Sequence, residues 1–119
     1  GIYEGVAQNK DMFDRYQSII SKWNAGELNI KIDGGESAMD LWDRQAPFIE
    51  RLKSETFSRI LVCSHGRSIR ALLCAITETP LEQMDDFSHT NTCLYKIVME
   101  DNQFRVVLSN NTDHLNHGI

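Results

Sequence analysis

The sequence predicts an α/β sandwich. Residues 9–23 and 36–55 carry apolar side chains every three or four positions, as amphipathic helices do. Residues 59–64 contain a short apolar run, residues 60–63, which is typical of a strand buried on both faces of a parallel sheet. Residues 92–99 and 104–108 are strand-like runs joined by a polar loop, which predicts an antiparallel hairpin. This order of elements favours an α/β sandwich whose sheet is incomplete.

The first two helices have recognisable starting points. We expect Asn9 or Asp11 to cap the first helix. We expect Ser37 to cap the second, with Asp40 three residues later as a weak capping box. Pro47 should kink the second helix or split it in two, because proline cannot donate to the helical ladder.

The remaining segments are shorter. Residues 28–32 alternate briefly and predict either a short strand or an extended loop. Residues 68–77 predict an amphipathic helix. Pro80 is expected to begin a short helical turn that runs through Phe87, and residues 109–118 are expected to form a polar loop.

Composition narrows the function classes. The chain of 119 residues has a net charge of −5 and no Lys/Arg cluster, so we expect no nucleic-acid partner. No apolar stretch approaches the roughly 20 residues of a membrane span, and no secretory signal is apparent. Cys63, Cys74 and Cys93 each lie in an apolar run and are expected to be reduced and buried, which favours a cytoplasmic location.

The chemistry of the chain centres on His65. It follows the predicted strand, and ligands of open α/β sheets bind beyond the carboxyl ends of strands. Gly66 lets the backbone approach a ligand, and the helix that follows offers free N–H groups. Arg67 and Arg70 suit the geometry of a phosphate. These features predict an anion pocket; the alternative is that His65 is a structural histidine at a strand end.

Other nucleophile signatures fit less well. A cysteine phosphatase needs an arginine six positions after its cysteine, but Ile69 stands there relative to Cys63. A serine-hydrolase elbow around Ser64 would need a glycine where Val62 stands. The strand–serine–helix context does match, so a serine hydrolase using Ser64 remains a weaker alternative.

Five motifs in order resemble those of the histidine phosphatase superfamily, which includes the phosphoglycerate mutases. The central one is the Ser-His-Gly motif within Val62-Cys63-Ser64-His65-Gly66-Arg67-Ser68-Ile69-Arg70-Ala71-Leu72-Leu73. The other four are residues 1–5, residues 34–37 with Asp40 and Arg44, residues 89–92, and residues 110–115.

The resemblance implies a three-layer α/β/α sandwich with a mostly parallel sheet and a C-terminal antiparallel hairpin. Residues 1–119 would be the C-terminal part of a single histidine phosphatase domain, so the sandwich would be incomplete. No Arg-His-Gly motif occurs in the chain. The phosphorylated histidine of the family, its partner arginines and its acid are therefore expected upstream of Gly1.

The resemblance also assigns site residues. His65 would be the catalytic second histidine of the pocket, which binds the transferring phosphoryl group and stabilises its charge. Gly66 and Arg67 would line the pocket. Glu36 and Ser37 would bind phosphate or substrate, although a helix start explains them equally well. No cofactor and no metal are expected.

The activity implied is hydrolysis of a small phosphorylated metabolite through a phosphohistidine, with inorganic phosphate as a further ligand. Mutase-type phosphoryl transfer is the nearest alternative. Without the nucleophile, these 119 residues alone should be inactive. We also expect a homodimer or strand exchange at the exposed sheet edge. A non-catalytic binding or oligomerisation role is the remaining alternative.

The other polar candidates are predicted to be ordinary surface groups. His89 precedes a predicted strand and could touch a substrate, but we expect it to be an exposed loop histidine. Asp85 and Asp86 are expected to be solvated. His114 and His117 lack a third ligand, so a metal site is not expected.

Overall fold

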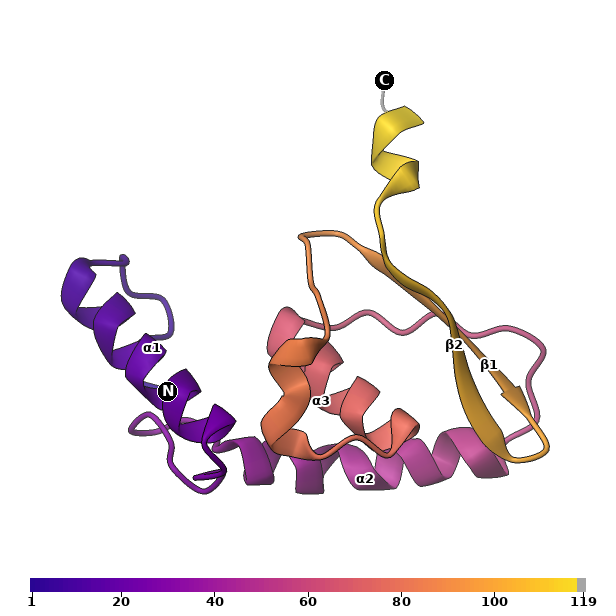
Figure 1. Cartoon of the computed structure of the whole chain (residues 1–119), viewed down its shortest axis with the longest axis horizontal. Coiled ribbons are helices and arrows are strands. Elements are labelled where there is room, and N and C mark those ends of the chain that lie inside the picture. The colour runs from indigo at the N-terminus through magenta and orange to yellow at the C-terminus, as the bar shows by residue number, and fades with distance from the viewer. Residues whose placement is uncertain (118–119) are drawn as a thin grey trace.

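Helix α3 lies at the centre of the structure. The computed structural model describes residues 1–117 (Figure 1). Its elements are α1 (Lys10–Asn24), α2 (Ala38–Ser54), α3 (Gly66–Thr77), the 3-10 helix η1 (Leu81–Asp86), β1 (Leu94–Glu100), β2 (Gln103–Asn111) and the 3-10 helix η2 (Asp113–His117).

The starts of α1 and α2 follow the sequence prediction. The Asn9 side chain accepts a hydrogen bond of 2.9 Å from the backbone N–H of Met12. Ser37 and Asp40 form a reciprocal capping box, with both hydrogen bonds at 3.0 Å. Pro47 does not split α2, which runs unbroken from 38 to 54. Proline removes a single hydrogen bond from the ladder, and the turns on either side retain theirs.

Two apolar clusters lie on different sides of α3. The first joins α3 to α1, α2 and η1; its buried members are Ile20, Trp23, Ala38, Leu41, Ala71, Cys74, Leu81 and Met84. The second joins α3 to α2 and the hairpin; its buried members are Ile49, Leu73 and Ile76, and the hairpin adds Tyr95, Ile97, Phe104 and Val106. The position of α3 therefore depends on packing from both sides.

The predicted hairpin is confirmed. Strands β1 and β2 pair antiparallel and are joined by a two-residue turn at Asp101 and Asn102. Both turn residues have positive φ, 52° and 63°, which suits the twist of a tight hairpin. The second strand extends to Asn111, three residues beyond the predicted end, and the tail that was expected to be loop contains η2.

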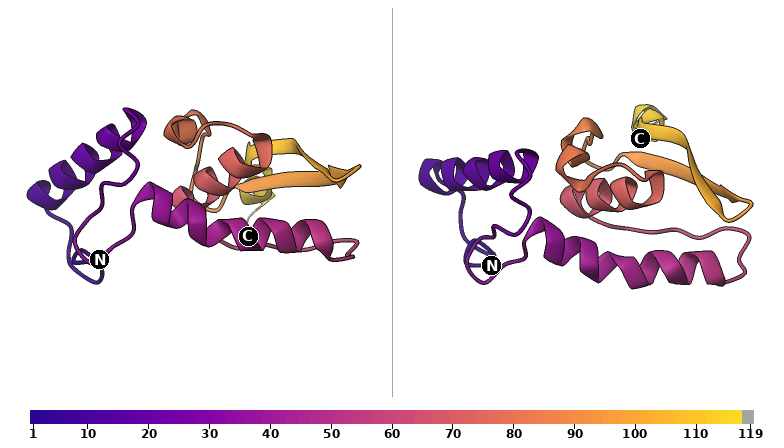
Figure 2. Two further views of the ribbon diagram at one scale, coloured as in Figure 1. Left: turned by 90° about the horizontal axis from the view of Figure 1, so that it is seen from below. Right: turned by 60° about the horizontal axis from the view of Figure 1, so that its bottom comes forward.

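The predicted strand at residues 59–64 does not form. The α2–α3 connection (residues 55–65) runs back along α2 as irregular chain (Figure 2). Within residues 1–117, no backbone hydrogen bond pairs residues 59–64 with another strand. A strand needs a partner for its N–H and C=O groups, and an apolar pattern alone does not supply one.

The sheet is consequently smaller than expected. The described residues contain one two-stranded antiparallel sheet, β1–β2, so the α/β class holds but the three-layer sandwich and the parallel sheet are not seen. Residues 28–32 are loop, tied by a single bridge between Lys31 and Ser37.

The arrangement is open rather than compact. Helix α1 lies at one end and the hairpin at the other (Figure 1). The radius of gyration is 15.9 Å. A compact domain of this length would have a radius of about 14 Å.

Candidate functional site

His65 is the residue at which the connection from α2 becomes helix α3. It is the N-cap of α3, with extended φ and ψ of −108° and 161°, and its side chain makes no capping hydrogen bond. Its ring is exposed, and no hydrogen bond to it occurs within residues 1–117. The first N–H groups of α3 therefore have no side-chain cap, and the residue before them carries an exposed imidazole, a combination that suits an anion.

Gly66 is in close contact with His89. A Cβ placed on Gly66 would lie 2.9 Å from Cδ2 and 3.1 Å from Nε2 of His89. The glycine is therefore required by the neighbouring ring. His89 is half-buried, which contradicts the prediction of an ordinary surface histidine.

Arg67 is held by two groups from other elements. Its Nε donates to the hydroxyl of Tyr16 in α1 at 3.3 Å, and its Nη1 forms an ion pair with Asp85 in η1. Asp85 also accepts a hydrogen bond of 2.9 Å from Asn24, and Arg70 lies 3.9 Å from the same carboxylate. Asp85 is exposed, as predicted, but it lies in η1 and is paired with other side chains, which the prediction of a solvated loop charge did not include.

The surroundings of Asp85 lower its pKa. Burial by itself would raise the pKa of this carboxyl group. The hydrogen bonds from Asn24 and Arg67, with the positive charges of Arg67 and Arg70, outweigh that effect and bring the pKa below its ordinary value. Asp85 is thus an ionised anchor that joins α1, α3 and η1.

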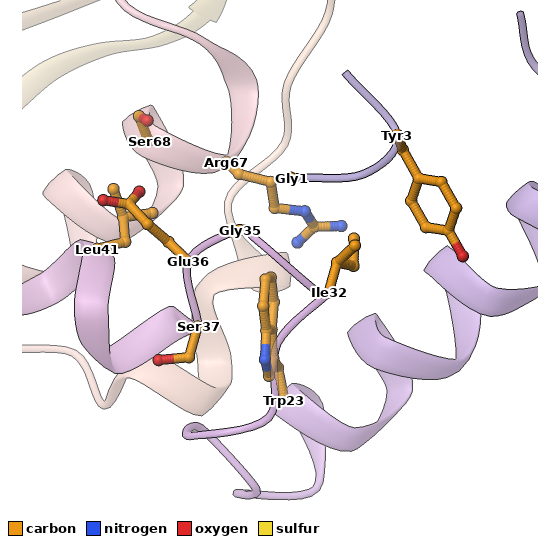
Figure 3. Close-up of a pocket in the computed structure, with 10 residues that line it drawn as sticks. All are labelled: Gly1, Tyr3, Trp23, Ile32, Gly35, Glu36, Ser37, Leu41, Arg67 and Ser68. Atoms are coloured by element: carbon orange, nitrogen blue, oxygen red, sulfur yellow. The ribbon is translucent and has the colours of Figure 1, made fainter. Parts of the chain in front are cut away.

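Three of the predicted site residues line one pocket. The cavity has a volume of about 260 Å³ and is lined by Arg67, Glu36 and Ser37. The Arg67 side chain extends from α3 toward the segment that carries Ile32 and Gly35 (Figure 3). The remaining lining residues of the cavity are Gly1, Tyr3, Trp23, Ile32, Gly35, Leu41 and Ser68. His65 and Gly66 are not among them, so the structure divides the predicted site residues into two groups.

Glu36 and Ser37 both have structural partners. Glu36 makes a bidentate pair with Arg44, at 2.7 and 3.0 Å, and hydrogen bonding to that guanidinium lowers the pKa of the carboxyl group. Ser37 is only 3% exposed, and its hydroxyl is used in the α2 cap. Ser37 therefore contributes to this wall chiefly by fixing the start of α2.

Ser64 has none of the partners that a serine nucleophile needs. It lines a second cavity with Arg44, Gln45, Phe48, Val62, Cys63 and Leu72, a set without a histidine. Within residues 1–117, no histidine is hydrogen bonded to its hydroxyl. An activated serine requires such a base, so the geometry does not favour the hydrolase alternative.

The cysteines differ in their surroundings. Cys74 is buried in the first apolar cluster, and burial raises the pKa of its thiol to about 11. Cys93 is half-buried, and its Sγ lies 3.5 Å from Nδ1 of His89. Cys63 is exposed, in a segment that has no strand partner among residues 1–117, so the prediction that it is buried is wrong.

Residues 1–117 show neither a candidate metal site nor a candidate membrane-spanning helix. No group of three or more histidine, cysteine or carboxylate side chains is gathered as a metal site within the part of the chain that the structure describes. None of the helices in that part is long and apolar enough to cross a membrane.

Comparison with known proteins identifies relatives of this chain. Two from Hydrogenobacter thermophilus are similar to this chain: one named "Phosphoserine phosphatase 1", 24% identical over 116 residues, and one named "Putative phosphoserine phosphatase 2", 25% identical over 114 residues. The matches cover 97% and 96% of this chain but 54% and 56% of the relatives. The chain therefore spans about half the length of the curated relatives it matches.

A match to a family model supports the resemblance that the sequence motifs indicated. The model of the histidine phosphatase superfamily (branch 1) matches residues 1–112, nearly the whole chain. The matched region contains the Ser-His-Gly motif, the residues around the cavity of Arg67 and the His89 segment. The chain belongs to the histidine phosphatase superfamily.

Proposed function

We propose that this protein hydrolyses a small phosphate monoester through a phosphohistidine intermediate, with His65 binding the phosphoryl group. The observation that carries the proposal is the exposed His65 ring beside the uncapped start of α3, in a chain of the histidine phosphatase superfamily. An imidazole and free backbone N–H groups together stabilise charge on phosphoryl oxygens.

The reaction has two steps. In the first, a nitrogen of the nucleophilic imidazole forms a bond to phosphorus as the ester P–O bond breaks, and the leaving oxygen takes up a proton. In the second, water attacks phosphorus and gives a proton to the group that protonated the leaving oxygen, the P–N bond breaks and inorganic phosphate is released. His65 would hold the equatorial oxygens in both steps, where charge is spread during transfer.

The nucleophile is proposed to lie outside these 119 residues. The chain contains no Arg-His-Gly motif, which is where the family resemblance places the phosphorylated histidine. We therefore expect the 119 residues alone to bind phosphate without turning over an ester. Kinetic tests belong on the complete gene product.

The first substrate to test is phosphoserine, because both relatives carry that word in their names. The Arg67 cavity of about 260 Å³ would take the organic part of such a substrate. Its wall also carries the Arg67 guanidinium and the Glu36 carboxylate. They are paired with Asp85 and Arg44, so the acid and the amine of such a substrate would have to compete with these partners. Transfer between positions of phosphoglycerate is the competing activity.

The deciding experiment replaces His65 by alanine in the complete gene product. Phosphate release from phosphoserine should fall by roughly a hundredfold or more, as it does when a donor to a transferring group is removed. His114→Ala is the matched control. His114 is exposed, its Nε2 bonds the backbone oxygen of Thr92, and its loss should leave turnover unchanged.

Two results would refute the proposal. One is a His65→Ala variant with the wild-type kcat and KM. The other is wild-type protein that interconverts phosphoglycerates faster than it releases phosphate from any ester. Acid-labile, base-stable phosphate on the protein during turnover would support the phosphohistidine step.

We also propose that a second copy of this chain pairs with the α2–α3 connection. Ile60, Leu61 and Val62 in this segment are 49%, 81% and 43% exposed. Their backbone groups have no strand partner within the described residues. An apolar segment with unpaired N–H and C=O groups favours pairing with another chain.

A further inference from the structure

His89 brings a second imidazole to the start of α3. Its ring lies against the Cα of Gly66, the residue that follows His65. The two histidines are 24 positions apart in sequence, one at the end of the α2–α3 connection and one in the segment before β1. The sequence alone did not suggest that they share one end of a helix.

Several contacts fix the segment that carries His89. The Thr90 backbone N–H donates to the side chain of Asn110 at 2.8 Å, and the Asn110 amide donates back to the Thr90 hydroxyl at 3.2 Å. The Tyr95 hydroxyl donates to the backbone oxygen of Ser88. These bonds tie both sides of His89 to the hairpin, so the ring is held by the core-packed sheet.

The orientation of the ring leaves one nitrogen for a ligand. Nδ1 lies 3.5 Å from the Sγ of Cys93, while Nε2 is on the side of Gly66. Within residues 1–117, no hydrogen bond involves Nε2 of His89. A neutral imidazole whose Nδ1 accepts from the thiol carries its proton on Nε2, and that N–H would point to the start of α3.

We propose that His89 is a further substrate-contacting residue, whose Nε2–H donates a hydrogen bond to the phosphoryl group that His65 binds. This inference rests on the proposed function, because it assumes an anion at the start of α3. It also explains Gly66: any side chain there would displace the His89 ring. His89 then supplies a donor from the hairpin side of the site.

The first test uses three replacements of His89 in the complete gene product. His89→Ala should raise the inhibition constant of inorganic phosphate and lower kcat/KM by roughly ten- to a hundredfold, as expected for loss of a hydrogen bond to a charged group. His89→Gln places its amide nitrogen near the position of Nε2 and should recover most of the phosphate affinity. His89→Asn places its amide near Nδ1 and should behave as alanine does.

The second test examines the contact with Gly66. Gly66→Ala should weaken phosphate binding as much as His89→Ala, because the new methyl group would lie 2.9 Å from the His89 ring and push the ring away. The double variant Gly66→Ala/His89→Ala should lose no more affinity than either single variant and should unfold at a higher temperature than Gly66→Ala alone. Strict additivity would contradict the proposed contact.

The outcomes separate this inference from the proposed function. If His65→Ala abolishes turnover but all three His89 variants keep the wild-type phosphate affinity, His89 has no contact with substrate and only this inference fails. If His89→Ala lowers the thermal stability and glutamine gives no rescue of phosphate affinity, the role is structural and the inference also fails. If His65→Ala is fully active, the proposed function itself fails.

Discussion

Two stretches of apolar chain flank α3, and only one of them is paired. In the hairpin, β1 pairs with β2, which follows it after a turn of two residues. One face of the hairpin packs on Leu73 and Ile76 of α3. The α2–α3 connection, residues 55–65, has a comparable apolar run but no partner within residues 1–117. The comparison shows that an apolar pattern indicates what a segment can bury, while a hydrogen-bonding neighbour decides whether it becomes a strand.

The same difference separates the two histidines at the start of α3. His89 precedes the hairpin and is half-buried, with neighbours bonded to β2. His65 ends the unpaired connection and is exposed. The segment of His89 is thus fixed by hydrogen bonds to the hairpin, whereas the His65 ring makes no hydrogen bond within residues 1–117.

The largest expected effect comes from the packing of the hairpin on α3. Leu73 is 1% exposed in the second apolar cluster, and Leu73→Ala should lower the free energy of unfolding by about 2–5 kcal/mol. The matched control is Leu61→Ala in the connection, where the side chain is 81% exposed and the change should stay within about 0.5 kcal/mol. Urea denaturation measures both. Equal losses of unfolding free energy in the two variants would contradict the conclusion that the hairpin side of α3 is packed and the connection is not.

A smaller effect is expected at Asp85, which anchors α3 to η1 and α1. Because folding lowers the pKa of this carboxyl group, the folded protein binds its proton less readily than the unfolded chain does. The stabilisation from ionised Asp85 is therefore complete above its ordinary pKa of 3.8 and is lost as the pH falls through the lower folded-state value.

The corresponding variant is Asp85→Asn. It should lose roughly 1 kcal/mol of stability at pH 7. The wild type and the variant should then converge in stability as the pH falls through the lowered folded-state pKa of Asp85, because the carboxylate takes up its proton there. Denaturation curves at pH 7 and over a series of acidic pH values measure the difference. A gap between the two proteins that is unchanged at low pH would contradict the assignment of Asp85 as an ionised anchor.

The smallest effect on folding is expected at the exposed face of the connection. Leu61→Lys should leave the free energy of unfolding nearly unchanged, since the side chain is 81% exposed. It should shift any dimer to monomer, because a charge on an exposed strand edge opposes pairing. Size-exclusion chromatography with light scattering gives the mass. A wild-type protein that stays monomeric at high concentration would overturn the proposed pairing of two copies.

Local signals in the sequence were sufficient for the helices and the hairpin. Asn9 and Ser37 cap α1 and α2 as expected, and a polar pair with positive φ joins β1 to β2. These features depend on neighbours within a few residues, which a sequence displays directly. The position of His65 immediately before a helix was predicted for the same reason.

The tertiary structure alone decided which distant groups meet. The sequence determined the family motifs, the helix starts and the place of His65, because these are local in the chain. It did not determine that His89 packs on Gly66 or that Asp85 holds Arg67. Nor did it determine that residues 59–64 have no strand partner in the part of the chain that the structure describes. Such contacts arise from the packing of α3 between two apolar clusters, and neither partner of a distant pair carries a local signal of the other.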